Sequence, residues 1–161
     1  MKSKTILKFI LALVILISVF LTGFFSAIES DEAIPSQIFR RSEAKVNTGE
    51  WGEMDLYTSG NTYTFGAEEV LTALTDILPG KSVHPSHRHG EEEFLIITRG
   101  TGEWSLKGQK IQAKSGDLMY INPWDFHGLV NTGSDTLTFF VIRWKNKLID
   151  KPAAPAGDNG R

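Results

Sequence analysis

Short strand-like segments separated by turn residues fill residues 70–144, and this pattern limits the fold more than any other feature of the chain. The segments span 70–78, 93–99, 102–107, 109–114, 117–122, 126–131 and 137–144. Most of them end at glycine, proline or asparagine, as strands commonly do. Lys107-Gly108 fits a two-residue hairpin turn, and residues 51–65 could add two more strands. Many short strands at this spacing predict an all-β sandwich or barrel.

The first 28 residues have a different character. Lys2, Lys4 and Lys8 precede an uncharged run over residues 9–28, and acidic residues follow it. A helix of 20 residues spans about 30 Å, which matches the hydrocarbon core of a bilayer. Lysines before such a run predict a cytoplasmic N-terminus and a chain that continues outside the cytoplasm. The run fits either a retained membrane anchor, in contact with lipid over residues 6–28, or a cleaved signal peptide.

The expected domain organisation follows from these two regions. Residues 1–28 are the anchor or signal peptide, and the polar segment 29–50 is expected to be a linker. Residues 51–148 contain the strand signals. Residues 149–161 are rich in Pro, Ala and Gly without periodicity, which predicts a disordered tail.

Composition excludes several classes of function. The sequence contains no cysteine, which rules out zinc–thiolate sites, iron–sulfur clusters and a cysteine nucleophile. Its formal net charge of −2 offers no basic field for nucleic acid.

The stretch HPSHRHGEEEF, residues 84–94, holds three histidines and three glutamates. His87 and His89 are two residues apart, so on a strand their side chains share one face. Glu93 opens an apolar strand, where a buried carboxylate is costly unless it is paired or bound to a metal. His127, beside Leu129, is a candidate fourth ligand from a distant strand. The alternatives are surface exposure for the HxH pair and a hydrogen-bonded core position for His127.

Two segments resemble the motifs of the cupin family. The first reads GKSVHPSHRHGEEEFLIITRG and the second reads GDLMYINPWDFHGLVN. The resemblance covers roughly residues 65–145, and it implies a double-stranded β-helix, or jelly roll, behind the N-terminal hydrophobic helix. It also implies that His87, His89, Glu93 and His127 converge inside the mouth of the barrel. Cupins of this kind often form homodimers, which makes a homodimer an expectation here.

Three imidazoles and one carboxylate suit one divalent first-row ion, whether Fe, Mn, Zn, Ni, Co or Cu. We therefore expect an extracytoplasmic metal-binding cupin with a small-molecule ligand or substrate and no nucleic-acid partner. One hypothesis is a metal-dependent oxygenase, isomerase or lyase that acts on a small polar molecule. The other is a non-catalytic module that uses the metal to bind or sense a small ligand.

Several further side chains could surround such a site. Tyr120, Trp124, Phe126 and Trp104 could line an aromatic pocket, although core or rim packing is the stronger interpretation of each. Arg143 could hold a substrate carboxylate or pair with a surface acid. His84 is expected in a loop outside the ligand set, and Glu91 and Glu92 are expected to be solvated.

Overall fold

A computed structural model of the chain describes residues 33–59, 62–150 and 152–157. The segment Ala33–Arg161 forms one compact unit. The apolar N-terminal run lies outside the described residues, so the anchor or signal peptide stays a prediction. Within the described ranges, no helix is both long and apolar enough to cross a membrane.

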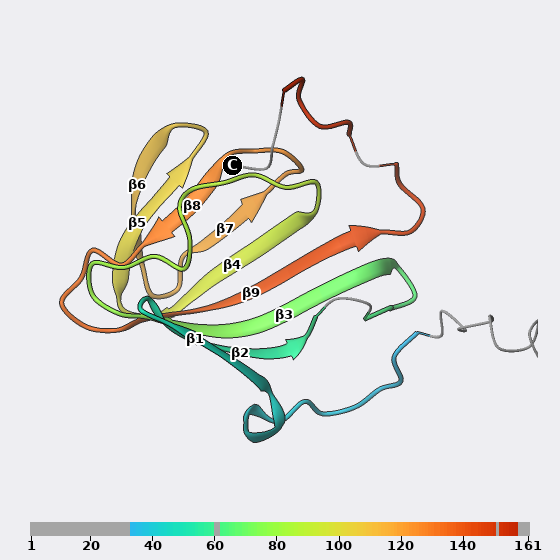
Figure 1. The fold of residues 1–161 in the computed structure, drawn as a ribbon, viewed down its shortest axis with the longest axis horizontal. Helices are drawn as coiled ribbons and strands as arrows, with labels where there is room; N and C mark the ends of the chain where they lie inside the picture. Colours follow the sequence, from blue (N-terminus) through green and yellow to red (C-terminus); the bar gives the residue numbers. More distant parts are fainter. Residues whose placement is uncertain (1–32, 60–61, 151, 158–161) are drawn as a thin grey trace, which may run out of the picture. The chain divides into compact units, whose positions relative to one another are not determined.

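The described residues of this unit form nine strands in two antiparallel sheets (Figure 1). The larger sheet has the order β1-β2-β3-β9-β4-β7, and the smaller has the order β6-β5-β8. A short 3-10 helix, η1 (Arg41–Glu43), precedes them. The strands are β1 (Lys45–Gly49), β2 (Gly52–Thr58), β3 (Ala67–Ile77), β4 (Glu92–Arg99), β5 (Thr101–Leu106), β6 (Gln109–Lys114), β7 (Leu118–Ile121), β8 (His127–Val130) and β9 (Leu137–Asn146).

Side chains from both sheets meet in one apolar core. Trp104, Ala113 and Leu129 contribute from the smaller sheet. The larger sheet contributes Ala73, Ile77, Leu95, Ile97, Met119, Ile121, Leu137, Phe139 and Val141. This two-sheet arrangement confirms the predicted all-β class and fits a jelly roll.

The predicted strand segments agree closely with the observed strands from β3 onward. Lys107 and Gly108 both have positive φ, 51° and 79°, and they join β5 to β6 as the two central residues of a hairpin turn. The structure differs from the expected pattern upstream. Among the described residues of the range 51–65 there is one strand, β2, and the segment expected to be a linker contains β1, which pairs with β2 from Lys45 to Gly49.

Strand alternation places polar side chains at one end of the interior. Along β4, Glu93, Leu95 and Ile97 are buried, and residues between them point outward. Along β9 the inward series is Leu137, Phe139 and Val141. At one end of the interior, the next inward-facing positions beyond these apolar residues carry the polar side chains that determine the chemistry of the site.

Candidate metal centre

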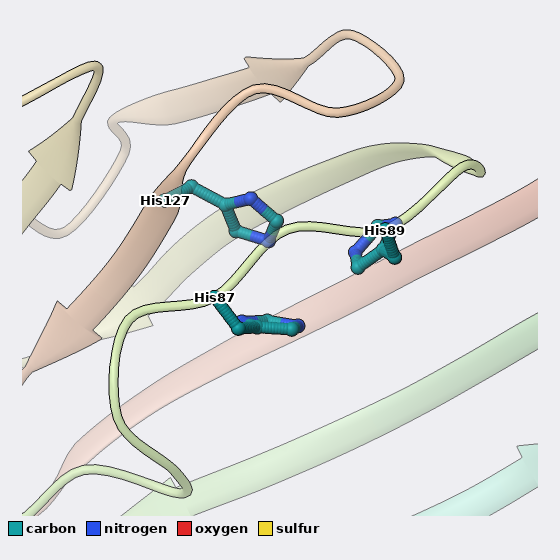
Figure 2. A group of neighbouring side chains, drawn as sticks. All are labelled: His87, His89 and His127. Atoms are coloured by element: carbon teal, nitrogen blue, oxygen red, sulfur yellow. The ribbon is translucent and has the colours of Figure 1, made fainter. Parts of the chain in front are cut away.

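Three histidines converge at the end of the barrel interior. His87 and His89 lie in the segment before β4, and His127 begins β8. The backbones of His87 and His127 exchange two hydrogen bonds of 2.9 Å, which hold the two segments side by side. One nitrogen from each of the three rings lies within 4.8 Å of the others. Figure 2 shows the rings turned toward one another.

Glu93 reaches the same point from the start of β4. It is only 7% exposed. One carboxylate oxygen lies 3.3 Å from His89 Nε2, and the other lies 3.7 Å from His127 Nε2. The four residues expected to meet from sequence therefore lie together in the structure.

Backbone carbonyls fix the orientation of two of the rings. His127 Nδ1 donates to the Asp125 carbonyl over 2.8 Å, and His89 Nδ1 lies 3.2 Å from the Glu91 carbonyl. A proton on Nδ1 leaves a lone pair on Nε2. The Nε2 atoms of His89 and His127 are buried without a hydrogen-bond partner, as is Nδ1 of His87. His89 Nε2 is near Glu93 but is not aligned for a hydrogen bond.

These unpartnered nitrogens are what a metal site requires. Buried polar atoms normally have partners, and leaving three of them unpaired in one place is costly. A cation at their centre would receive the lone pairs, and the Glu93 carboxylate would supply negative charge. The donor set therefore fits a single divalent ion.

The electrostatics keep His87 and His127 in the form that binds metal. Burial lowers the pKa of His87 to about 3, with further lowering from His84, His127, His89 and Arg143. Burial also lowers the pKa of His127, although its bond to the Asp125 carbonyl and the charge of Glu93 act in the opposite direction. Both rings are neutral at pH 7, and a neutral imidazole is the ligand form.

A cavity of about 110 Å³ adjoins the cluster. His87, His127 and Glu93 line it together with two further ionisable side chains, His84 and Arg143. The rest of the wall is apolar apart from Gly128, and consists of Met54, Leu71, Ile77, Val83, Leu95, Met119, Leu129, Phe139 and Val141. The site is thus a small, mainly apolar chamber with charged groups near the histidines.

The proposed aromatic pocket is not present. None of Trp104, Tyr120, Trp124 and Phe126 lines this cavity, although all four lie in the described part of the chain. Trp104 is buried in the core, whereas Tyr120 and Phe126 are about 40% exposed. The packing interpretation holds for these residues.

Two glutamates expected to be solvated have specific contacts. The Glu91 carboxylate lies 3.4 Å from His89 Nδ1, in addition to the contact of its carbonyl with that atom. Glu92 accepts a hydrogen bond from the Tyr120 hydroxyl over 2.6 Å and another from Asn146. Glu91 therefore helps to position a candidate ligand, a role that its place in a run of acids did not reveal.

Sequence reasoning also missed the apolar wall. Met54, Leu71 and Val83 come from three separate segments, and nothing in their local sequence marks them as neighbours of a histidine cluster. The one available signal was strand parity, because Leu71 shares a face with the buried residues Ala73, Thr75 and Ile77.

Comparisons with known proteins agree with this fold. The family model for the cupin domain matches residues 73–143. A gentisate 1,2-dioxygenase from Streptomyces is 28% identical over 106 residues, which are 63% of this chain and 30% of that enzyme. An oxalate-binding protein from Thermotoga maritima is 31% identical over 72 residues, which are 45% of this chain and 60% of that protein.

Solved structures show the same fold. The crystal structure of a predicted oxalate decarboxylase from Thermotoga maritima superposes with a TM-score of 0.53 at 24% identity, over 68% of this chain and 99% of that one. The matched cupin model, the two antiparallel sheets and the converging histidines lead to one conclusion: residues 73–143 of this chain belong to a small cupin domain.

Proposed function

We propose that the protein is a metal-dependent enzyme that acts on a small polar molecule in the chamber beside the histidine cluster. The observation that carries the proposal is the convergence of three buried, unpartnered imidazole nitrogens beside the Glu93 carboxylate. A site that served only the fold would pair these atoms with one another or with backbone groups.

His87, His89, His127 and Glu93 would hold the ion, which the donor set restricts to Fe, Mn, Ni, Co, Zn or Cu. Such an ion supplies Lewis acidity and open coordination positions. The protein supplies orientation, because the Asp125 and Glu91 carbonyls fix the rings of His127 and His89. The apolar wall limits access of water and restricts the size of the substrate.

A non-catalytic binding module is the second candidate. Apart from the proposed ligands, His84 and Arg143 are the only ionisable side chains among the described residues that line the cavity. This leaves few groups for proton transfer, which favours capture over turnover. The curated relatives include a protein named as a dioxygenase and another named as oxalate-binding, so they support both candidates.

Elemental analysis of purified variants tests the metal site. His87→Ala and His127→Ala should lose most of the bound metal, and Glu93→Gln should weaken binding because it removes the one negative charge. His84→Ala is the matched control, since His84 is exposed and lies outside the group of converging nitrogens. Retention of metal by His127→Ala together with its loss from His84→Ala would contradict the ligand assignment.

Turnover separates the two candidate functions. Protein loaded with each candidate metal can be screened for oxygen uptake and for conversion of oxalate, gentisate and a metabolite mixture. Consumption of a substrate that depends on His127 supports the enzyme. Tight ligand binding without any turnover would instead favour the binding module.

The location outside the cytoplasm is part of the proposal, and its support is the lysines before the apolar run. A reporter that is active only outside the cytoplasm, fused after Lys147, should be active. Activity of a cytoplasmic reporter at the same position would contradict this topology. Mass spectrometry of the mature N-terminus would distinguish a cleaved signal peptide from an anchor.

A further inference from the structure

We propose that Arg143 binds a carboxylate of the substrate, so that the substrate class is a small carboxylate anion with a short apolar portion. The inference rests on the proposed function, because it assigns the molecule that the same chamber takes. Sequence alone left Arg143 with two roles, a substrate anchor or a partner of a surface acid.

The position of Arg143 in β9 directs it into the chamber. It follows the inward residues Leu137, Phe139 and Val141 at the same two-residue spacing. Its backbone register partners are Glu93 on β4 and Leu71 on β3. All three of these side chains line the cavity. A cation thus occupies the interior position directly across from the candidate metal-binding carboxylate.

Arg143 differs from two surface arginines of the same domain, because it has no acidic partner in the described part of the chain. Arg41 binds Asp55 over 2.7 Å, and Arg99 lies 3.6 Å from Asp76. Arg143 has no ion pair or side-chain hydrogen bond with any residue of the described ranges. A half-buried guanidinium carries five N–H donors, and leaving them without acceptors in an apolar chamber is unfavourable.

A carboxylate satisfies this need better than a neutral polar group does. The planar guanidinium fork matches the two oxygens of a carboxylate and binds them with charge-assisted hydrogen bonds. The rest of the ligand would contact the apolar wall formed by Met54, Leu71 and Val83. A cavity of about 110 Å³ excludes a large anion.

Lactate and lactamide are suitable probes, because they have the same number of non-hydrogen atoms and differ in charge. The full chain, purified in a mild non-ionic detergent and loaded with zinc, would be titrated with each compound by calorimetry. Zinc is measured on every sample. The variants are Arg143→Met, which removes the charge but keeps an apolar stem, and Arg143→Lys, which keeps the charge but loses the fork. Arg99→Gln is the matched control, since Arg99 is paired elsewhere on the surface.

The wild type should bind lactate about tenfold or more tightly than lactamide. Arg143→Met should weaken lactate binding by about 10- to 100-fold, the usual effect of losing a charged hydrogen bond, while affecting lactamide by less than about threefold. Arg143→Lys should show a smaller loss, and Arg99→Gln should match the wild type.

If zinc is fully retained, either of two results would overturn the inference. One is equal affinity of the wild type for lactate and lactamide, and the other is an unchanged lactate affinity in Arg143→Met. If Arg143→Met does not fold, Arg143→Lys decides, and wild-type affinity in that variant counts against the inference. Failure of the proposed function looks different. A wild type that holds no zinc but still prefers lactate through Arg143 would overturn the metal proposal and support the anion site.

Discussion

Acidifying the metal-free protein should destabilise it, and His87 should contribute a separable share of the loss. Its pKa is lowered from 6.5 to about 3, mainly by burial. Between these values the native ring stays neutral, whereas the unfolded ring takes up a proton. The contribution of the neutral ring to the free energy of unfolding is therefore fully present above the pKa of the unfolded-state ring. It is lost progressively as the pH falls toward the pKa of the native ring. The lowered pKa of His127 acts in the same direction.

The size of the His87 effect follows from linkage. At about pH 5, protonation of the unfolded ring favours unfolding by about 2 kcal/mol, a value that hardly changes for any native pKa below about 4.5. Because the ring is only partly buried and solvent screens part of its surroundings, we expect about 1–2 kcal/mol. A change of this size is a sizeable fraction of the stability of a small domain.

Urea unfolding followed by tryptophan fluorescence measures this effect in the presence of a chelator. Between about pH 7.5 and pH 5, the wild type should lose about 1–2 kcal/mol more than His87→Gln, a midpoint difference of roughly 0.5–1 M urea. Carboxylates and His127 titrate in both proteins, so comparison of the two losses isolates His87. Equal losses in the two proteins would refute the reasoning, because a ring that stays neutral only in the native state must produce the difference.

Further predictions concern glycines and assembly. A Cβ on Gly128 would lie 2.4 Å from Ser86 Oγ and 3.1 Å from its Cα. Gly128→Ala should therefore lower the free energy of unfolding by about 1–3 kcal/mol. It should also lower the zinc content at limiting zinc, because the displaced Ser86 directly precedes His87. An unchanged melting temperature and an unchanged zinc content would contradict this prediction. Gly100 and Gly108 both have positive φ, but a Cβ on Gly100 would lie 2.9 Å from Leu137 Cα, and one on Gly108 meets nothing. Gly108→Ala should lower the free energy of unfolding by about 1 kcal/mol, and Gly100→Ala should lower it by about 1–3 kcal/mol more. Equal melting temperatures of the two variants would show that the steric explanation is wrong. The homodimer stays a prediction, which sedimentation velocity tests.

The strands around the site could be predicted from sequence because alternation and turn chemistry agree there. Glycine or proline follows most of the apolar segments, and Lys107-Gly108 adopts the positive φ angles that its turn requires. β1 was missed for a physical reason. All five of its residues are exposed, so it has no apolar alternation, and it is held by backbone pairing with β2.

The candidate ligands could be predicted from the sequence, whereas the groups that orient them could not. Histidines two apart and a carboxylate at the start of a buried strand are visible in residue types. The carbonyls of Asp125 and Glu91 hold the rings of His127 and His89, yet every residue has a carbonyl, and only the folded loop shows which ones are used. Arg143 lies between these cases, since its inward face was predictable but its lack of an acidic partner was not.

The paired strands β4 and β9 show why the chemistry belongs at one end of the barrel. Their inward register pairs run from Ile97 and Phe139, through Leu95 and Val141, to Glu93 and Arg143. The first two pairs are apolar and bury area that stabilises the fold. The third places a carboxylate and a guanidinium where apolar side chains would pack at lower cost. The Glu93 carboxylate is near two histidines instead of the guanidinium, so the pair is not a simple internal salt bridge. Each charge is directed to something else: Glu93 to the cation that the histidines would share, and Arg143 to an anion in the chamber beside them.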